Sequence, residues 1–467
     1  MFRMTKVFVQ TSLLLLLSCS LRAQQYGLFG TGTLFDGFEN PAQKTFKLDS
    51  SRKFASNFFL PYFGLKFQNR GNETFFRELI NTGLYDTSNI PLGTGEMNTG
   101  VQSSNIYLAT LKIFHSYKYH KEIGLSWQVK TDGQLDYTNE TLAVLENYRR
   151  LKNSGIKNFD DAFNNKGWLQ SYHQFSLSYR ENYTKRLAFG IKLSLLSGIS
   201  HNKLNIQESG FATLGDSDTI VVRLRGIYQG SFLYWDEVSK KTLVPTFKSP
   251  GASISLGTTY TAKNGVFIMG NIKDLGLIRW SRSSVTANFD KLLLIDTATN
   301  TARDIENKIT DVVIDVHKRK RHYTPTNARA DFMISKPFWL GYGRFSYTPG
   351  IIASKNLFHK GGDAAWVNKF QYNDFALSLI PAYNFNNFTS LGIQGLYKTA
   401  NFEAFVGSDN LFKTSSDIPG AIKATLNENR GPLNASIYMG LSIKFGRTVE
   451  HPQNSSTMPG IENIRRR

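Results

Sequence analysis

The feature that most limits the fold of this chain is a period-two alternation of apolar and polar residues. In the stretch SIYMGLSIKF, residues 436–445, successive side chains of a β-strand would point to opposite sides of a sheet. One face would carry Ile437, Met439, Leu441, Ile443 and Phe445, and the other Ser436, Tyr438, Gly440, Ser442 and Lys444. The same pattern recurs at residues 123–130, 175–180, 187–195, 253–260 and 389–397. Such an apolar face is covered either by a protein core or by a lipid bilayer.

The N-terminus predicts export from the cytoplasm. Two basic residues and an apolar run at residues 7–17 precede Leu21-Arg22-Ala23, which resembles a signal-peptidase site. We expect a signal peptide at residues 1–23, cleavage after Ala23, and a mature chain that starts at Gln24. An alternative is lipoprotein processing, in which Cys19 would be the lipidated residue.

Cys19 is the only cysteine, so cleavage after Ala23 would leave a chain without disulfides, stabilised by burial or by a membrane. The signal region holds three of the 55 Lys and Arg residues and none of the 36 acids, which leaves the mature chain with 16 surplus positive charges. For an exported chain we expect anionic lipid or lipopolysaccharide phosphates as partners, and no nucleic acid. The alternative is that the basic loops are simply solvated.

No apolar run after the signal is long enough for a helical membrane span. The mean hydropathy is −0.29 and the aromatic content is 13%, a combination that suits a sheet with one apolar and one polar face. A soluble sandwich would give the same signal, but its repetition along the chain favours an all-β fold, a transmembrane antiparallel β-barrel in the outer membrane. Short connections at residues 181–186, 264–265 and 336–337 alternate with long ones at 131–171, 201–250, 281–326 and 354–373, as expected for periplasmic turns and external loops.

Candidate strands lie near residues 53–67, 105–115, 121–130, 172–180, 186–196, 252–261, 265–280, 327–335, 340–353, 374–383, 388–398, 401–407 and 433–446. Single-chain bacterial barrels have an even number of strands, so this odd set lacks one. We expect the missing strand between Leu411 and Arg430, around Ala421 to Leu426. The prediction is therefore about 14 strands over residues 52–446, with 12 and 16 as alternatives.

Three segments do not resemble wall strands. Residues 72–82 have helical spacing, with Asn72 as a candidate cap, and residues 140–151 resemble a second short helix. The polar residues 447–467 predict a disordered periplasmic tail.

Several motifs resemble known families. Phe445 matches the aromatic residue of the C-terminal signal read by the bacterial barrel-assembly machinery, although 22 residues follow it here. Asn40-Pro41-Ala42, just after the mature N-terminus, resembles the hatch region of long-chain fatty-acid transporters of the FadL type and of related Bacteroidota barrels, among them the PorV-like proteins and a large family of unknown function. Further similarities to the unknown-function group are Lys273-Asp274-Leu275-Gly276 with Trp280, and Gly407-Ser408-Asp409-Asn410-Leu411. The chain lacks the Gly/Ala-rich run that precedes the hatch motif in true fatty-acid transporters.

The resemblance implies a barrel that passes a small, mainly hydrophobic molecule across the outer membrane. We expect residues 24–51 to form a hatch inside the lumen, because Pro41 restricts Asn40 to extended conformations and the Asn40 side chain can satisfy nearby backbone groups. The alternatives are an ordinary periplasmic extension for this segment and, for the whole protein, a non-transporting interaction barrel that is PorV-like and linked to secretion. An outer-membrane enzyme is a third alternative.

The motifs of zinc proteases, serine hydrolases and phosphate-binding loops are missing from the sequence, and its eight histidines are scattered. We therefore expect no catalytic residues, no cofactor and no metal. The densest basic run is Lys318, Arg319, Lys320 and Arg321, a candidate contact for lipopolysaccharide phosphates at the outer leaflet. Its alternative role is that of a solvated loop.

Overall fold

The computed structural model describes residues 31–449 apart from several short internal segments. Those segments are residues 73–74, 83–87, 89, 148–157, 215–218, 233–242, 297–303, 305–307, 309–310, 313–314, 341–342, 424 and 427–431. The signal peptide, the alternative lipidation at Cys19 and the tail beyond residue 449 lie outside the described residues, so the expectations about them stay predictions.

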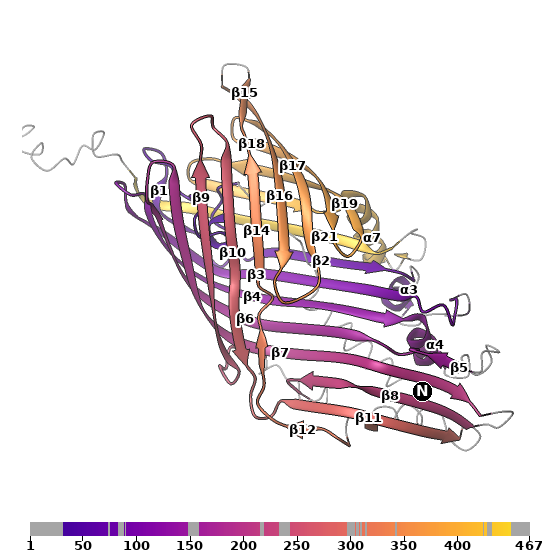
Figure 1. Cartoon of the computed structure of the whole chain (residues 1–467). Coiled ribbons are helices and arrows are strands. Elements are labelled where there is room, and N and C mark those ends of the chain that lie inside the picture. Colours follow the sequence, from indigo (N-terminus) through magenta and orange to yellow (C-terminus); the bar gives the residue numbers. More distant parts are fainter. Residues whose placement is uncertain are drawn as a thin grey trace, which may run out of the picture.

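One antiparallel sheet closes on itself into a barrel of 14 strands (Figure 1). In order around the barrel, the wall strands are β1 (Arg52–Ser56) with β2 (Tyr62–Arg70) as its continuation, β3 (Met97–Ser116), β4 (Lys121–Thr138), β6 (Lys166–Asn182), β7 (Leu187–Thr213), β9 (Pro250–Thr261), β10 (Phe267–Arg279), β14 (Arg329–Ser335), β16 (Phe345–Asn356), β17 (Gly362–Tyr372), β18 (Phe375–Asn384), β19 (Phe388–Lys398), β20 (Phe402–Ser408) and β21 (Asn434–Thr448). The last strand pairs with both β1 and β2, which closes the ring. The predicted fold class and strand number are confirmed.

The two faces of the wall strands differ in polarity as the alternation predicts. In β21, Met439, Ile443 and Phe445 are exposed on the outer face, whereas Tyr438 and Lys444 point inward and are buried. In β7, 51% of Leu193 is exposed and only 1% of Lys192. A barrel with an apolar outer band and a polar interior is the arrangement of a membrane-spanning barrel.

The two ends of the barrel have different connections. Short turns at residues 117–120, 183–186, 262–266, 373–374 and 399–401 join strands at one end, which we call the short-turn end. The connections at the other end, the long-loop end, contain α3 (Phe75–Thr82), α4 (Asn139–Asn147) and α7 (Leu411–Lys423). The predicted alternation of short and long connections holds from β3 to β10. It is wrong for residues 354–373, because only residues 357–361 join β16 to β17, and β18 and β19 are also joined by a short turn at the long-loop end.

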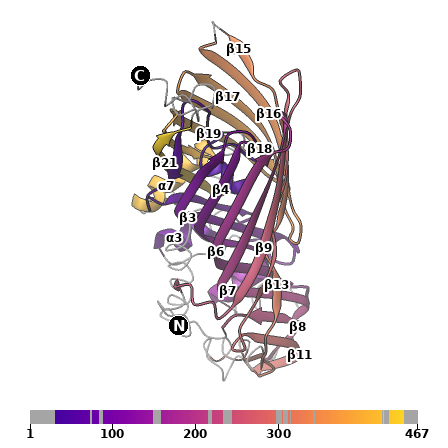
Figure 2. The same ribbon diagram turned by 90° about the vertical axis from the view of Figure 1, so that its left-hand side faces the viewer.

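Part of the sheet continues past the barrel at the long-loop end. The second half of β7 leaves the wall and pairs with β8 (Thr219–Gly230), which pairs in turn with β11 (Val285–Asp296). Two short strands, β5 (Asn158–Asp160) and β12 (Lys318–Arg319), complete this extension, which projects from the ring in both views (Figures 1 and 2). Much of what the sequence suggested as loops is therefore sheet with its own core, which includes Phe211 and Phe289.

Two strand predictions are wrong. The missing strand is β17, within the residues expected to be a long loop, and not a strand between Leu411 and Arg430. That stretch begins with α7, whose first turn is capped by Asn410, since the Asn410 side-chain oxygen accepts a hydrogen bond from the Lys413 backbone N–H at 3.3 Å. The last strand also continues two residues past the predicted boundary, to Thr448.

The two short helices expected from helical spacing are present. The side chain of Asn72 accepts a hydrogen bond from the Phe75 backbone N–H at the start of α3, as a cap does. The second helix, α4, covers Asn139–Asn147, and residues 148–151 of the prediction lie outside the described residues. Within the described part of the chain, no helix is long and apolar enough to cross a bilayer.

The first wall strand is interrupted between β1 and β2. Phe58 and Phe59 adopt positive φ angles, and their side chains are exposed on the outer face of the barrel. The side chain of Asn57 fills the interruption, because its Nδ2 donates to the Leu60 carbonyl at 2.8 Å and its Oδ1 accepts from the Thr110 N–H at 2.8 Å. Backbone groups that would otherwise lack partners at this seam are thereby satisfied.

Candidate functional site

The described part of the N-terminal segment, residues 31–51, enters the barrel before the first wall strand; we call it the hatch. It contains one helical turn, α2 (Asp36–Glu39), and Leu34, Phe35 and Phe38 around it are fully buried. Its backbone and side chains bond to β3, β4, β6, β10 and β20, which lie on different sides of the barrel wall. These residues therefore lie in the lumen, whereas residues 24–30 of the predicted hatch are outside the described part.

The Asn40-Pro41-Ala42 motif forms a tight turn against the wall. The Asn40 side-chain oxygen accepts a hydrogen bond from the Ala42 N–H at 2.9 Å, and the Asn40 carbonyl accepts one from Gln43 at 3.0 Å. Two wall glycines make room for this turn. A Cβ atom on Gly190 would lie 2.2 Å from the Pro41 carbonyl carbon, and one on Gly257 would lie 2.1 Å from the Asn40 side-chain oxygen. The glycines on the inner face thus allow the close approach of the motif.

Glu39 is the main polar anchor of the hatch at this turn. Its carboxylate accepts hydrogen bonds from the side chains of Asn105 and Tyr107 in β3, both at 2.7 Å, and forms an ion pair with Lys273 in β10. The Glu39 carbonyl also accepts a hydrogen bond from Asn271 at 3.1 Å. One residue therefore connects the hatch to two separate parts of the wall.

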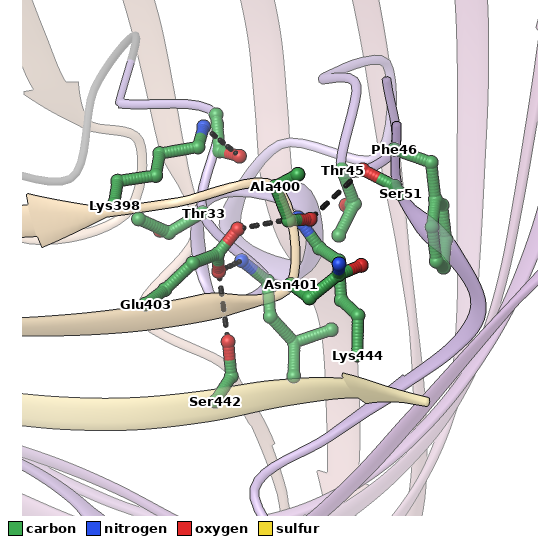
Figure 3. Close-up of polar contacts among 12 residues, drawn as sticks. Thr33, Thr45, Phe46, Ser51, Lys398, Ala400, Asn401, Glu403, Ser442 and Lys444 are labelled. Carbon is green, nitrogen blue, oxygen red and sulfur yellow. Dashed lines mark hydrogen bonds and ion pairs between the residues drawn. The ribbon is translucent and has the colours of Figure 1, made fainter. Parts of the chain in front are cut away.

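A second anchor lies on the opposite flank, where β19, β20 and β21 meet the start of the hatch (Figure 3). The Glu403 carboxylate accepts a hydrogen bond from the Leu34 N–H at 2.9 Å and is paired with Lys444 at 2.6 Å. The Lys398 ammonium donates to the carbonyls of Thr31 and Gly32 at 2.9 and 2.6 Å. The wall here satisfies the hatch backbone with charged side chains, which give stronger hydrogen bonds than neutral ones.

A third anchor lies toward the short-turn end. The Glu122 carboxylate accepts from the Thr45 N–H at 3.1 Å and pairs with Lys112 at 3.1 Å. Arg180 donates from Nε to the Ala42 carbonyl at 2.8 Å. The end of the hatch is therefore fixed to β4 and β6.

The Lys273-Asp274-Leu275-Gly276 motif forms a β-bulge in β10. The pairing register with β9 shifts between Ile272 and Leu275, and Asp274 has a positive φ of 53°. The bulge brings two adjacent side chains to the inner face. Lys273 pairs with Glu39 of the hatch, while Asp274 pairs with Lys130 and, at 3.1 Å, with Lys192.

Two cavities lie on either side of the hatch. The long-loop chamber is bounded by Asp36, Glu39 and Asn40 of the hatch and by residues of β3, β4 and β14. The short-turn chamber is bounded by hatch residues 43–47 and by the turn residues Lys185 and Arg186. The hatch therefore separates two spaces within one lumen.

The long-loop chamber is polar, and its fixed charges balance. Its lining holds four acids (Asp36, Glu39, Asp132 and Asp331) and four bases (Lys130, Lys273, Arg329 and Lys360). Asn40 and Asn105 belong to this lining, and the Nδ2 of Asn40 and the Oδ1 of Asn105 are buried and make no hydrogen bond with a described residue.

The remaining side of the hatch is apolar. Phe35, Phe38 and Leu34 pack with Tyr62, Tyr107, Phe405, Tyr438 and other wall residues in one buried cluster. The rings of Phe35 and Tyr62 lie 4.9 Å apart, beside the interruption between β1 and β2. The interior wall is thus aromatic on this side of the hatch.

Two titratable groups of the hatch have shifted pKa values. Burial raises the pKa of the Asp36 carboxyl to about 7, and the hydrogen bond from the Gly32 N–H opposes this shift in part. Burial lowers the pKa of the Lys44 ammonium, and the nearby positive charge of Arg180 lowers it further. Both groups carry their charge less readily here than in water.

The sequence places this barrel in a described family. The sequence model of the "Family of unknown function (DUF5723)" matches residues 48–409. The chain belongs to this family. No curated protein matches the sequence at a significant level.

Two solved structures similar to this family member are the toluene transporter TodX of P. putida and the toluene transporter TbuX of Ralstonia pickettii. The TodX match has 9% identity and a TM-score of 0.40 and covers 87% of this chain and 93% of TodX. The TbuX match has 9% identity and a TM-score of 0.42 and covers 89% of this chain and 94% of TbuX. The barrel of this family member is established by its own strand pairing.

The other residues singled out in the sequence lie away from the hatch anchors. Phe445 is on the outer face at the β1–β21 seam, where its ring stacks with that of Phe54 at 5.5 Å. The run from Lys318 to Arg321 is exposed at the edge of the extension. Neither position tests the proposed role in assembly or in lipopolysaccharide binding. In the described residues, no group of three or more His, Cys, Asp or Glu side chains is arranged to hold a metal ion.

Sequence reasoning found the hatch motif but missed most of its anchors. Glu39 directly precedes the Asn40-Pro41-Ala42 motif but was given no role, and neither were Glu122 and Glu403. A signal existed in the alternation itself, because both glutamates occupy lumen-facing positions of membrane-spanning strands. A buried carboxylate requires a partner, so such positions mark interior contacts.

Proposed function

We propose that this protein passes a small, mainly hydrophobic molecule across the outer membrane, with the hatch as the element that restricts passage. The observation that carries the proposal is the position of the hatch between two chambers of one lumen. Folded segments close the lumen of wide barrels, since wall side chains do not fill it. In this proposal the short-turn end faces the periplasm.

The character of the molecule follows from the surfaces that it would meet. The aromatic cluster between the hatch and the wall gives an apolar solute a path along one side of the lumen once the hatch moves. The polar and charged lining of the long-loop chamber suits a polar group on the same solute. We therefore propose a molecule with an apolar body and at least one polar group.

Deletion of residues 24–45 tests the proposal. The deletion removes α2 and the Asn40 turn but leaves the wall strands, so a folded variant should show higher single-channel conductance in planar bilayers than the complete mature protein. Heat-modifiable migration on gels identifies the folded barrel. Unchanged conductance from a folded deletion variant would reject the hatch as a barrier.

The second candidate is a non-transporting interaction barrel. It is favoured by the extension of β7, β8 and β11, which projects from the ring and exposes Leu292 and Leu294. An unchanged conductance in the deletion experiment would favour this candidate. Both candidates share the same further proposals. These are contacts with lipopolysaccharide and with the barrel-assembly machinery, a cleaved signal peptide and an origin in the Bacteroidota.

A further inference from the structure

The short-turn chamber is strongly and unevenly charged. Its described lining includes Lys44 and Lys47 from the hatch, Lys185 and Arg186 from a turn, and Lys369 from β17, together with Arg180 and Lys398, and no Asp or Glu. The long-loop chamber, on the other side of the same hatch, has equal numbers of acids and bases. The positive charge is thus concentrated at one end of the lumen.

Two of these cations already have partners. Arg180 donates to the carbonyls of Ala42 and His120 and to the Asn182 side chain, each at 2.8 Å. The Lys398 ammonium donates to two hatch carbonyls. These two side chains hold the hatch in position and add positive charge to the chamber.

The other five cations have no direct ion-pair partner among the described residues, and the acids that attract two of them, Glu122 for Lys44 and Asp36 for Lys369, act at longer range. The side chains of Lys44, Lys47, Lys185, Arg186 and Lys369 make no ion pair or hydrogen bond with any residue that the structure describes. Lys44 and Lys47 are exposed to the chamber. Like charges that converge on a partly enclosed space repel one another, and solvent screens them less there than on an open surface.

We propose that the short-turn chamber is a binding site for a small anion with several negative charges, carried by phosphate or carboxylate groups. Ammonium and guanidinium groups are the donors that proteins use for both chemistries. The cations come from two bodies, since Lys44 and Lys47 belong to the hatch and Lys369 and Arg186 to the wall. An anion between them contacts both the hatch and the wall. Its binding therefore stabilises the state in which the hatch stays inside the barrel.

Binding to the purified full-length barrel in an uncharged detergent tests this site. Inorganic tripolyphosphate and citrate serve as the phosphate and carboxylate probes, with sodium chloride at equal ionic strength as the reference. We expect saturable heat of binding for at least one probe, together with a higher midpoint of thermal unfolding. A parallel arm compares nanodiscs with and without anionic phospholipid, which separates a soluble anion from a lipid headgroup.

The double variant Lys44→Gln/Lys369→Gln removes one cation from each body and breaks no contact that the structure shows. We expect its affinity for the probe to fall by roughly tenfold or more, and the thermal shift to disappear. Lys360→Gln, in the long-loop chamber, is the matched control and should bind as the unchanged protein does.

Three outcomes would overturn the proposal. They are the absence of saturable binding for both probes, equal affinity in the double variant and the control, and a stabilisation that appears only with anionic lipid. The measurement involves no transport, so its result is independent of the conductance experiment on the hatch.

Discussion

Glu39 connects the hatch to β3 and to β10 through one buried carboxylate. Its hydrogen bonds to Asn105 and Tyr107 and its ion pair with Lys273 place three wall side chains around a single group. Breaking a buried ion pair at one partner leaves the other charge without compensation, which costs more than the pair itself contributes.

We expect Glu39→Gln to destabilise the barrel by about 3 kcal/mol, because Lys273 would lose its direct ion-pair partner while it stays largely buried. The measurement is the free energy of unfolding of the refolded barrel in urea, with planar-bilayer conductance as a second measurement, which should rise. Glu208→Gln is the matched control. It removes a carboxylate that pairs with Arg223 and Arg225 on the exposed extension, and it should cost less than about 1 kcal/mol. Equal costs for the two variants would contradict the role of Glu39 as an anchor.

Asp36 gives the hatch a defined pH dependence. Its pKa is about 7 in the folded protein and 3.8 as the reference value, so between these pH values the folded state keeps a proton that the unfolded chain loses. The free energy of unfolding therefore falls as the pH rises from about 4 to 7, and this contribution is constant above pH 7.

The variant Asp36→Asn should remove this pH dependence, because its side chain is neutral throughout. We expect it to be more stable than the unchanged protein at pH 8, by on the order of 2–4 kcal/mol, and equally stable at pH 4. Thermal unfolding midpoints of both proteins from pH 4 to 8 measure the difference. Parallel pH profiles would show that Asp36 does not titrate in this range.

At the residue scale the sequence located motifs but not their contacts. The bond between Asn271 and the Glu39 carbonyl joins residues 232 positions apart, and nothing local in either segment encodes it. The sequence shows both motifs, Asn40-Pro41-Ala42, which Glu39 precedes, and Lys273-Asp274-Leu275-Gly276. Their meeting through Glu39 and Lys273 is decided by the closure of the barrel around the hatch.

At the scale of single elements, β17 shows where the alternation signal ends. Its inner face carries Ala365 and Val367, which pack with Ile352 and Ile380 in an apolar cluster on the lumen wall. Its outer face includes the polar Asn368. Because both faces mix apolar and polar residues, the period-two contrast cancels and the segment resembles a loop in sequence. The clear alternation of β7 and β21, by contrast, arises because their inner faces meet polar and charged groups.

The assignment of faces in β7 can be tested with arginine. Leu193→Arg places a charge on the outer face near the middle of the strand, which should cost roughly 2–4 kcal/mol in a bilayer. Ser194 is an unsuitable lumen control, since its side chain is buried against Gln174 and Ser176 at 2.9 Å. Gln134→Arg is the better control because Gln134 lines the long-loop chamber. The fraction of heat-modifiable barrel after refolding into lipid vesicles measures both, and equal losses would contradict the assigned faces.

At the scale of the whole molecule, the sequence was sufficient for the barrel and insufficient for the extension. The prediction of about 14 strands rests on alternation, turn lengths and the even number that single-chain barrels require. The residues of β8 and β11 were expected to be loops. Their apolar side chains pack in a local core outside the ring, so the thickness of a membrane does not set the pattern of these strands. The positive short-turn chamber also needed the structure, since its cations come from the hatch, a turn and strands β6, β17 and β19.

The seam between the first and last strands has a consequence for biogenesis. Arg52 and the Gly446 carbonyl, which meet there at 3.1 Å, are 394 residues apart in the chain, so this contact closes a loop that contains most of the protein. Contacts of such separation form late, because the entropy of loop closure must be overcome before they stabilise anything. Until then the edges of β1 and β21 are unpaired, and the growing sheet can join a neighbouring edge in place of its own. Ring closure, with Phe54 stacked on Phe445, is thus the step that pairs these two edges within one chain.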